Sequence, residues 1–194
     1  MRVVVKIVHR VNNDYFVTST KPKRKLSHKM CYTVFQTNQG WMALVASQTG
    51  IVAATLPQTT RRQALDLLGE KAKQADFAPD ALSSLTRRFQ DYYSGKKTAF
   101  PDALDFSGAT EFQKQVWQAA QQIPHGETRS YGWIAKQIGK PRAARAVGQA
   151  LGKNPFLVIV PCHRVIAGDG TLGGFGCGLP AKQKLLKLEK TTKS

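Results

Sequence analysis

The chain has 194 residues, which suffice for one large domain or two small ones, and 42% of them are hydrophobic, enough for a buried core. It carries 29 Lys and Arg against 12 Asp and Glu, and the net charge of +17 indicates a polyanionic partner, nucleic acid before an acidic membrane surface. Three cysteines without a Cys-x-x-Cys pair exclude a disulfide framework and favour a reducing compartment, and no stretch is long and apolar enough to predict a membrane span.

Residues 1–30 predict a basic N-terminal extension of irregular structure. The segment Lys21-Pro22-Lys23-Arg24-Lys25 is typical of a solvated basic terminus, and it would also suit a nuclear address or a phosphate-binding arm. Residues 31–106 predict an α+β domain that begins with an antiparallel meander. Its three strands are expected over Tyr32–Thr37, Trp41–Ser47 and Ile51–Leu56.

Two helices complete this predicted domain, over about Thr60–Gln74 and Pro79–Tyr93. The second helix has one apolar stripe, and Gly95 stops it. The stripe consists of Leu82, Leu85, Phe89 and Tyr92. The segment Lys96–Gly108 is expected to be an extended crossover, and it contains the predicted boundary to a second domain, residues 107–194.

From Thr110 the pattern predicts a mostly helical C-terminal domain. Thr110 caps a helix with one apolar face, and Ser130 caps a shorter helix that Gly139 closes. Pro141 is expected in the first turn of the next helix, because proline is favoured there. The two helices joined at Gly139 form a candidate helix-turn-helix, and a last helix is expected over Ala181–Leu188.

The predicted helix Arg142–Leu151 has an unusually flat face. Its small residues are Ala143, Ala144, Ala146, Gly148 and Ala150. Such a surface permits close approach to a polyanion, with Arg145 reaching phosphates or inserting among bases. A packed core helix with solvated arginines fits the pattern equally well when the helix is taken alone. Together with the basic composition and the paired helix, the pattern favours DNA binding.

Cys162 stands between an apolar run and two basic residues. The run Val158-Ile159-Val160 is short and β-branched, which predicts a buried strand that Pro161 ends, so that the thiol faces a cleft. His163 and Arg164 follow directly. Neighbouring cations lower the pKa of a thiol below its usual value of about 8.5, which favours the nucleophilic thiolate. A lone cysteine is more often a buried structural residue, but the proline and the basic neighbours favour a nucleophile.

Five motifs in order resemble the O(6)-alkylguanine-DNA alkyltransferases, also called methylated-DNA–protein-cysteine methyltransferases. They are Phe112–Trp117, Ile123–Tyr131, Arg145–Gly148, Asn154-Pro155 and Pro161–Val165. The resemblance covers residues 107–189 strongly, and residues 32–106 are similar to the family's N-terminal domain in outline.

The resemblance implies direct reversal DNA repair. The alkyl group of O(6)-alkylguanine, and also of O(4)-alkylthymine, would move irreversibly to Cys162 in a single turnover. The partner would be double-stranded DNA, bound through its minor groove by the helix-turn-helix, with the damaged base flipped into a pocket. The resemblance further implies a monomer without a cofactor, cytoplasmic in a prokaryote or nuclear in a eukaryote.

The resemblance also implies a role for each matching residue. Cys162 is the acceptor, His163 the base that acts through a bridging water, and Glu189 the carboxylate that orients the base. Asn154 holds the turn that carries the cysteine. Tyr131 crowds the phosphate 3′ to the target and protonates the departing guanine.

Further residues are implied at the DNA and in the base pocket. Arg145 would take the place of the flipped base in the stack. The neighbouring DNA-contact residues would be Arg142, Ala143, Ala144 and Gly148. The pocket residues would be Pro161, Val165, Phe175, Gly176 and Lys182. The backbone carbonyls of Cys162 and Val165 would read the exocyclic amine of guanine.

The chain departs from the family pattern in three places. Phe175 and Gly176 stand where many relatives have a tyrosine and a serine, and Cys177 is expected to be a bystander thiol. The first 30 residues have no counterpart in the pattern. Some relatives hold a structural zinc, but His9, His28 and Cys31 lack a fourth ligand, so we predict no metal site.

Two other functions fit the residues less well than repair does. A damage-recognition protein without transfer would replace the acceptor cysteine, whereas Cys162 is present. A cysteine hydrolase would take its cysteine and histidine from separate segments, whereas Cys162 and His163 are neighbours.

Overall fold

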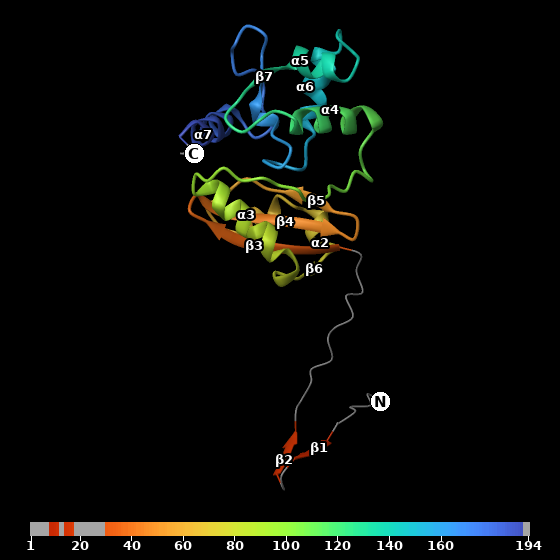
Figure 1. The fold of residues 1–194 in the computed structure, drawn as a ribbon, viewed down its shortest axis with the longest axis vertical. Helices are drawn as coiled ribbons and strands as arrows, with labels where there is room; N and C mark the ends of the chain where they lie inside the picture. Colours follow the sequence, from red (N-terminus) through yellow and green to blue (C-terminus); the bar gives the residue numbers. More distant parts are fainter. Residues whose placement is uncertain (1–7, 12–13, 18–29, 192–194) are drawn as a thin grey trace.

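The computed structural model describes residues 8–11, 14–17 and 30–191. Beyond a short antiparallel pair, β1 (Val8–Val11) and β2 (Asp14–Val17), the ribbon forms two lobes (Figure 1). We call the elements from β3 to α3 the N-terminal lobe and those from α4 to α7 the C-terminal lobe. The β1–β2 pair was not expected in an irregular extension, and the domain limits at residues 30 and 106 stay a prediction.

The predicted antiparallel meander is confirmed. Strands β3 (Met30–Thr37), β4 (Gly40–Ser47) and β5 (Ile51–Ala54) follow one another in the sheet, whose order is β5-β4-β3-β6. The fourth strand, β6 (Asp76–Phe77), was not predicted and pairs parallel with β3. Alternate residues face opposite sides of the sheet: Phe35, Met42 and Leu44 join one apolar cluster, and Val34, Ala43 and Val45 join another.

Helices cover both faces of this sheet. The single helix expected over Thr60–Gln74 is instead two short ones, α1 (Arg61–Asp66) and α2 (Glu70–Lys73), because Gly69 takes a φ of 55° and interrupts the hydrogen-bond ladder. The helix expected over Pro79–Tyr93 opens with a 3₁₀ turn, η1 (Asp80–Leu82), and continues as α3 (Ser83–Tyr93). The predicted apolar stripe of α3 is buried.

The C-terminal lobe is mostly helical, which confirms the predicted fold class. Its helices are α4 (Glu111–Gln121), α5 (Tyr131–Gln137), α6 (Ala144–Gly152) and α7 (Leu179–Lys190). A two-stranded parallel pair, β7 (Arg129–Ser130) and β8 (Val165–Ile166), lies beside them. Thr110 and Ser130 cap α4 and α5 as expected. Among the described residues, no helix has the length and apolar character that a bilayer crossing requires.

The turn between α5 and α6 differs from the prediction at one point. Gly139 takes a φ of 69°, its N–H donates to the carbonyl of Lys136, and the N–H of Lys140 donates to the carbonyl of Ala135 at 2.8 Å. This pair of bonds is the Schellman ending of a helix. Pro141 then occupies a tight turn closed by the N–H of Ala143, not the first turn of α6, because proline equally suits the second position of a β-turn.

The strand predicted over residues 158–160 does not exist. The segment is a buried turn in which the N–H of Val160 donates to the carbonyl of Phe156 at 2.8 Å. Val158 takes a φ of 74°, which is a strained conformation for a β-branched residue. The apolar run therefore indicates burial and not a strand: Val158, Ile159 and Val160 are at most 5% exposed.

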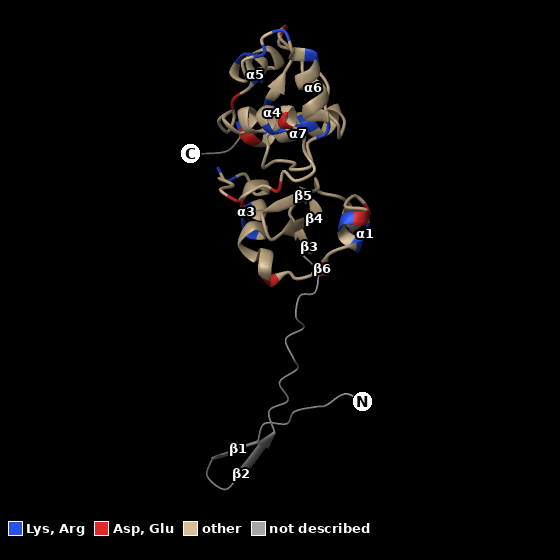
Figure 2. Cartoon of the chain, turned by 90° about the vertical axis from the view of Figure 1, so that its right-hand side faces the viewer, with Lys and Arg blue, Asp and Glu red and all other residues tan. Residues whose placement is uncertain are grey.

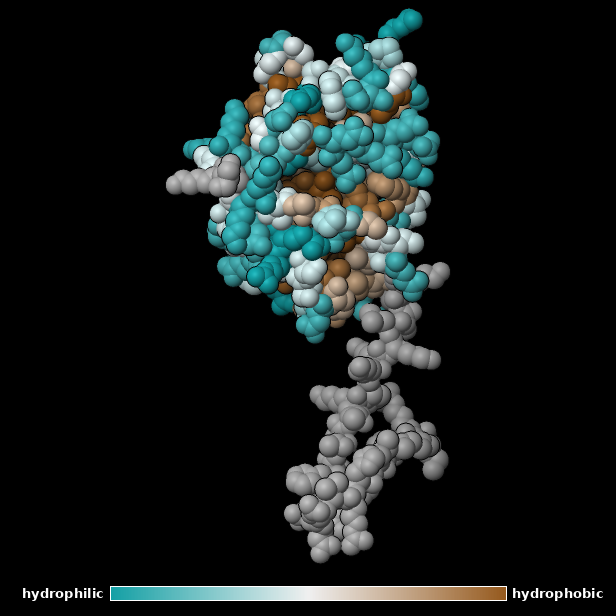
Figure 3. Space-filling model, in the orientation of Figure 1, coloured by the Kyte–Doolittle hydropathy of each residue, from teal (hydrophilic) through white to brown (hydrophobic). Residues whose placement is uncertain are grey.

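One continuous core joins the two lobes, and apolar side chains gather along their junction (Figure 3). The rings of Phe106, Trp117 and Phe156 contact one another, with centroids 5.5 to 6.2 Å apart. The backbone adds a direct link, because the N–H of Ala54 in β5 donates to the carbonyl of Pro155 at 2.9 Å. The meander thus supports the turn that leads to Cys162.

We predict that Gly50→Ala lowers the free energy of unfolding by about 2 kcal/mol or more. A Cβ on Gly50 would lie 2.4 Å from the carbonyl oxygen of Ala103, in the crossover segment, and the φ of Gly50 is 150°. Gly108→Ala is the control, because a Cβ there meets nothing within 4 Å. Its unfolding free energy should change by less than about 1 kcal/mol. Equal changes in urea unfolding of the two variants would contradict this account of the crossover.

Candidate active site

The thiol of Cys162 projects from a tightly wound turn. Pro161 has φ −81° and ψ 60°, and the N–H of Cys162 donates to the carbonyl of Val160 at 2.8 Å, which is an inverse γ-turn. A 3₁₀ turn, η2 (Cys162–Arg164), follows directly. Because proline already has the required φ, this backbone brings Cys162 to the edge of the core in one conformation.

Asn154 ties this turn together. Its side-chain Nδ2 donates to the carbonyl of Val160 at 3.0 Å and to Cys162 Sγ at 3.1 Å, while its Oδ1 accepts from the N–H of Phe156 at 2.9 Å. The side chain is buried, so each of these bonds is shielded from competing water. One amide therefore holds the strained backbone and supports the sulfur at the same time.

The resting thiol is protonated at neutral pH. Burial raises the pKa of Cys162 to about 11, and the hydrogen bond from Asn154 offsets this only in part. The sequence-based expectation that adjacent cations activate the thiol is wrong. His163 and Arg164 direct their side chains to Glu189, on α7, because neighbouring residues of the turn point in different directions.

The carboxylate of Glu189 lies at the centre of a buried polar cluster. Its Oε1 accepts from Tyr92 Oη at 2.7 Å, His163 Nε2 at 2.8 Å and Arg164 Nη2 at 2.9 Å. Its Oε2 accepts from Arg164 Nε at 2.9 Å and from the backbone N–H of Gly126 at 3.1 Å. Burial raises the pKa of Glu189, but the hydrogen bonds from His163 and Arg164 outweigh it, and the net pKa is well below the usual range.

These contacts determine the state of His163. Because a carboxylate can only accept, the imidazole proton is assigned to Nε2. Nδ1 is buried and has no hydrogen-bond partner among the described residues, so its lone pair is free to accept a proton. Burial lowers the pKa of His163 by more than its hydrogen bond to Glu189 raises it. His163 is therefore a neutral, oriented base adjacent to the acceptor candidate.

Cys162 lines a pocket of about 450 Å³, a size within the usual range of ligand sites. Six other residues expected at the DNA or in the base pocket line it with Cys162: Tyr131, Ala144, Arg145, Gly148, Phe175 and Gly176. Four further residues of its wall were not expected from the sequence: Gln149, Leu151, Gly152 and Gly174. Nothing in their residue types sets them apart. They become pocket residues because the segment Gly173–Gly178, which we call the Gly-rich loop, lies close to the end of α6.

Tyr131 connects the two sides of this pocket. A Cβ on Gly148 of α6 would lie 3.6 Å from its ring, and a Cβ on Gly173 would lie 2.9 Å from it. The hydroxyl donates to the carbonyl of Gly174 at 3.1 Å. Burial raises the pKa of Tyr131, so its hydroxyl keeps its proton at neutral pH. The ring thus requires glycine at position 173 and anchors the loop over the pocket.

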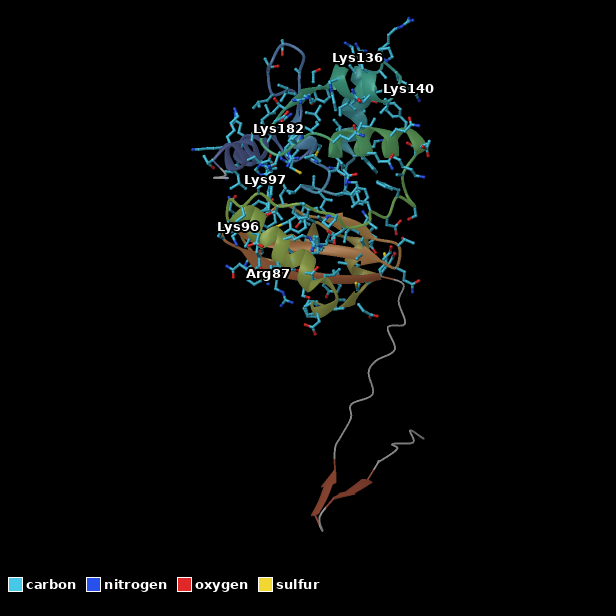
Figure 4. The ribbon with its side chains drawn as sticks, in the orientation of Figure 1. Arg87, Lys96, Lys97, Lys136, Lys140 and Lys182 are labelled. Atoms are coloured by element: carbon cyan, nitrogen blue, oxygen red, sulfur yellow. The ribbon has the colours of Figure 1, made fainter. Side chains whose placement is uncertain are left out.

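Lys182 does not line the pocket, contrary to expectation. It lies inside the C-terminal lobe on α7 (Figure 4) and is fully buried. Its Nζ donates to the carbonyls of Val165 at 2.6 Å, Gly174 at 3.3 Å and Leu172. Lys182 therefore fastens the loop to the segment after Cys162, and the Val165 carbonyl already has a donor. Pro161 and Val165 are likewise buried behind the pocket wall.

A basic surface lies outside this pocket. A second hollow is lined by Arg142, Ala143, Ala144, Arg145, Ala146 and Gln149, so Arg145 borders both. Lys136 and Lys140 lie at the same end of the C-terminal lobe (Figure 4), where Figure 2 shows several basic and few acidic positions. The flat face predicted over Arg142–Leu151 is open except at Ala150, which is buried in the core. Arg145 on α6 and Arg142, which precedes the helix, are exposed.

Cys177 and the candidate metal ligands named in the sequence analysis are not found in the lining of this pocket among the described residues. Cys177 is exposed and lines a groove between the lobes instead. Within the described part of the chain, no three His, Cys, Asp or Glu residues lie close enough to hold a metal ion. His28 and the side chain of His9 lie outside the described residues.

Comparison with known proteins links the chain to one family. A family model described as "6-O-methylguanine DNA methyltransferase, DNA binding domain" matches residues 111–191. A methylated-DNA–protein-cysteine methyltransferase of Mycolicibacterium paratuberculosis is 54% identical over 112 residues, which cover 58% of this chain and 67% of that relative. A relative of the same name from Methanosarcina acetivorans is 39% identical over 160 residues, covering 82% of this chain and 98% of the relative.

A solved structure agrees over most of the chain. The crystal structure of Mycobacterium tuberculosis OGT in complex with DNA is 41% identical in sequence and superposes with a TM-score of 0.68. The match covers 83% of this chain and 93% of that protein.

We predict that Glu189→Gln lowers the free energy of unfolding at pH 7 by about 3 to 5 kcal/mol, because it leaves Arg164, whose side chain is only 11% exposed, without its carboxylate. Glu127→Gln is the control, because Glu127 pairs with Arg129 at half-exposed positions. This substitution should change the free energy of unfolding by less than about 1 kcal/mol.

The effect of Glu189→Gln should also depend on pH. The pKa of Glu189 is lower in the folded than in the unfolded state. The ionised carboxylate therefore stabilises the folded state fully above the unfolded pKa of about 4.3, and this stabilisation is lost as pH falls toward the folded pKa. Denaturation at pH 7, 5 and 3 should show the curves of wild type and Glu189→Gln converging in acid. A constant difference would contradict the charged cluster.

Proposed function

Since this chain belongs to the methylated-DNA–protein-cysteine methyltransferase family, whose activity is direct repair of O(6)-methylguanine in DNA, we propose that Cys162 is the alkyl acceptor. The observation that carries the proposal is the position of its sulfur. Cys162 lines the pocket between the Gly-rich loop and α6, and Arg145 joins that pocket to the basic surface. Cys31, by contrast, lies on β3 in the other lobe, and Cys177 faces the groove between the lobes.

The transfer is a displacement at carbon. The sulfur of Cys162 forms a bond to the alkyl carbon while the bond from that carbon to guanine O6 breaks, and the electron pair stays on guanine. Because the thiol is protonated at rest, a base must take its proton. We assign this step to His163 Nδ1 through a bridging water, with Glu189 orienting the ring.

The departing guanine gains a proton as its charge develops, and the Tyr131 hydroxyl at the pocket wall is our candidate donor. The thioether formed on Cys162 is stable, so each molecule repairs one base. The same displacement applies to O(4)-alkylthymine, whose alkyl carbon is bonded to an equivalent exocyclic oxygen.

Double-stranded DNA would bind along α6, and the protein would bind it as a monomer. The DNA backbone can approach closely at three small residues, Ala143, Ala144 and Gly148. Arg142 adds a positive charge that attracts the phosphates. The target base must leave the stack to reach the sulfur, and Arg145 stands where it could fill the gap.

The first test is intact mass after mixing the protein with equimolar duplex that contains one O(6)-methylguanine. Wild type, Cys31→Ala and Cys177→Ala should each gain one methylene, and Cys162→Ala should gain none. Excess duplex should give no turnover beyond one equivalent. A wild type that binds the duplex and stays unmodified would overturn the proposal. A parallel duplex with O(4)-methylthymine tests the second substrate, which methylation of Cys162 would support and an unmodified protein would refute.

Arg145→Ala should slow transfer from duplex DNA about tenfold or more, because the gap left by the flipped base is no longer filled. Transfer from the free base O(6)-methylguanine should change less than about threefold. Arg87→Ala, which removes an exposed cation from α3 in the other lobe (Figure 4), is the control for general charge effects at the same salt concentration. Equal losses on both substrates would refute this role for Arg145.

A further inference from the structure

The N-terminal lobe supplies one hydrogen-bond donor to the buried cluster behind Cys162. Tyr92 lies in the last turn of α3, and its hydroxyl donates to Glu189 Oε1 at 2.7 Å across the junction of the lobes. The same oxygen accepts from His163 Nε2 at 2.8 Å. The hydroxyl and the imidazole therefore share one acceptor atom, so the position of Tyr92 affects where the oxygen lies relative to the ring.

The environment of Tyr92 keeps this donor in place. The residue is 1% exposed, and its ring packs edge-on against Tyr93, Phe100 and His125, with centroids 5.1 to 6.2 Å apart. Burial and the charge of Glu189 both raise the pKa of Tyr92 well above its usual value. The hydroxyl thus remains protonated and can only donate to the carboxylate at any pH where the protein works.

We infer that Tyr92 is a positioning residue for alkyl transfer, through which the N-terminal lobe orients the Glu189–His163 pair behind the thiol. The inference rests on the proposed roles of Cys162 and His163. It gives the N-terminal lobe a part in the chemistry, because the hydrogen bond from Tyr92 on α3 completes the set of donors around the carboxylate on α7.

Loss of the Tyr92 hydroxyl has two expected consequences. Oε1 would retain His163 and Arg164 as donors and become a stronger acceptor for the imidazole, which stabilises the protonated ring. The carboxylate would also lose one of the contacts that determine its orientation. The other titratable or charged groups that act on this pair are His125 after α4, Arg164 in η2 and Lys182 on α7.

The chain contains a matched control for this hydroxyl. Tyr93 is the next residue of α3 and is 2% exposed, and its hydroxyl is buried without a hydrogen-bond partner among the described residues. Tyr92→Phe and Tyr93→Phe each remove one buried hydroxyl from adjacent positions of the same helix. Only the first removal touches the cluster of Glu189, so a general effect of losing a hydroxyl should appear in both variants.

The experiment is single-turnover methyl transfer by the full chain from an O(6)-methylguanine duplex, measured between pH 5 and 9. Tyr92→Phe should lower the rate constant at neutral pH about tenfold, and the rising limb of its pH profile should move to higher pH. Tyr93→Phe should retain the rate within about twofold and the profile of wild type. Thermal unfolding of both variants, measured in parallel, checks that each is folded.

A second readout does not depend on DNA. The ring nitrogen shifts of His163, followed by NMR during a pH titration, should show protonation at higher pH in Tyr92→Phe than in wild type and Tyr93→Phe. Identical pH profiles and ring titrations in the two variants would overturn the inference. If wild type itself leaves Cys162 unmodified, the proposed function fails instead, so the two failures are distinguishable.

Discussion

A buried carboxylate without partners would cost several kcal/mol, and the active-site half of this molecule is organised around avoiding that cost at Glu189. Its two oxygens accept five hydrogen bonds from donors on three other segments of the chain. Arg164 supplies the charge, and Nη1 of the same side chain donates to the carbonyl of Ile123 at 2.7 Å. The cluster therefore joins α3, the loop after α4, η2 and α7, and holds the imidazole of His163 in one orientation.

The thiol itself is held in a contrasting environment. Burial keeps Cys162 protonated, while Asn154 and the strained turn at Val158 fix where its sulfur lies. A protonated, buried thiol is a poor target for adventitious electrophiles and oxidants, because the thiolate is the reactive species. Such an arrangement suits the proposed mechanism, in which a base activates the thiol only when a substrate occupies the pocket.

Two side chains hold the Gly-rich loop in place over the pocket. The Nζ of Lys182 donates hydrogen bonds to three backbone carbonyls, and the hydroxyl of Tyr131 donates to the carbonyl of Gly174. Both side chains therefore hold the Gly-rich loop over Cys162. The loop lies close to α6 at Gly176, where a Cβ would be 3.2 Å from the carbonyl oxygen of Gly152. Pocket shape thus depends on the glycines of the loop, on buried Lys182 and on Tyr131, which is also the proposed proton donor.

The sequence by itself determined the elements whose signals are local: the meander, the caps Thr110 and Ser130, and the glycine ending at Gly139. It also determined the family, through motifs such as Pro161–Val165. Only the tertiary structure decided that residues 158–160 are a turn, since β-branched apolar residues signal burial and strand alike. It also decided that His163, Arg164 and Tyr92 all donate hydrogen bonds to Glu189. Such long-range partnerships follow from how the lobes dock, which no local pattern of residue types encodes.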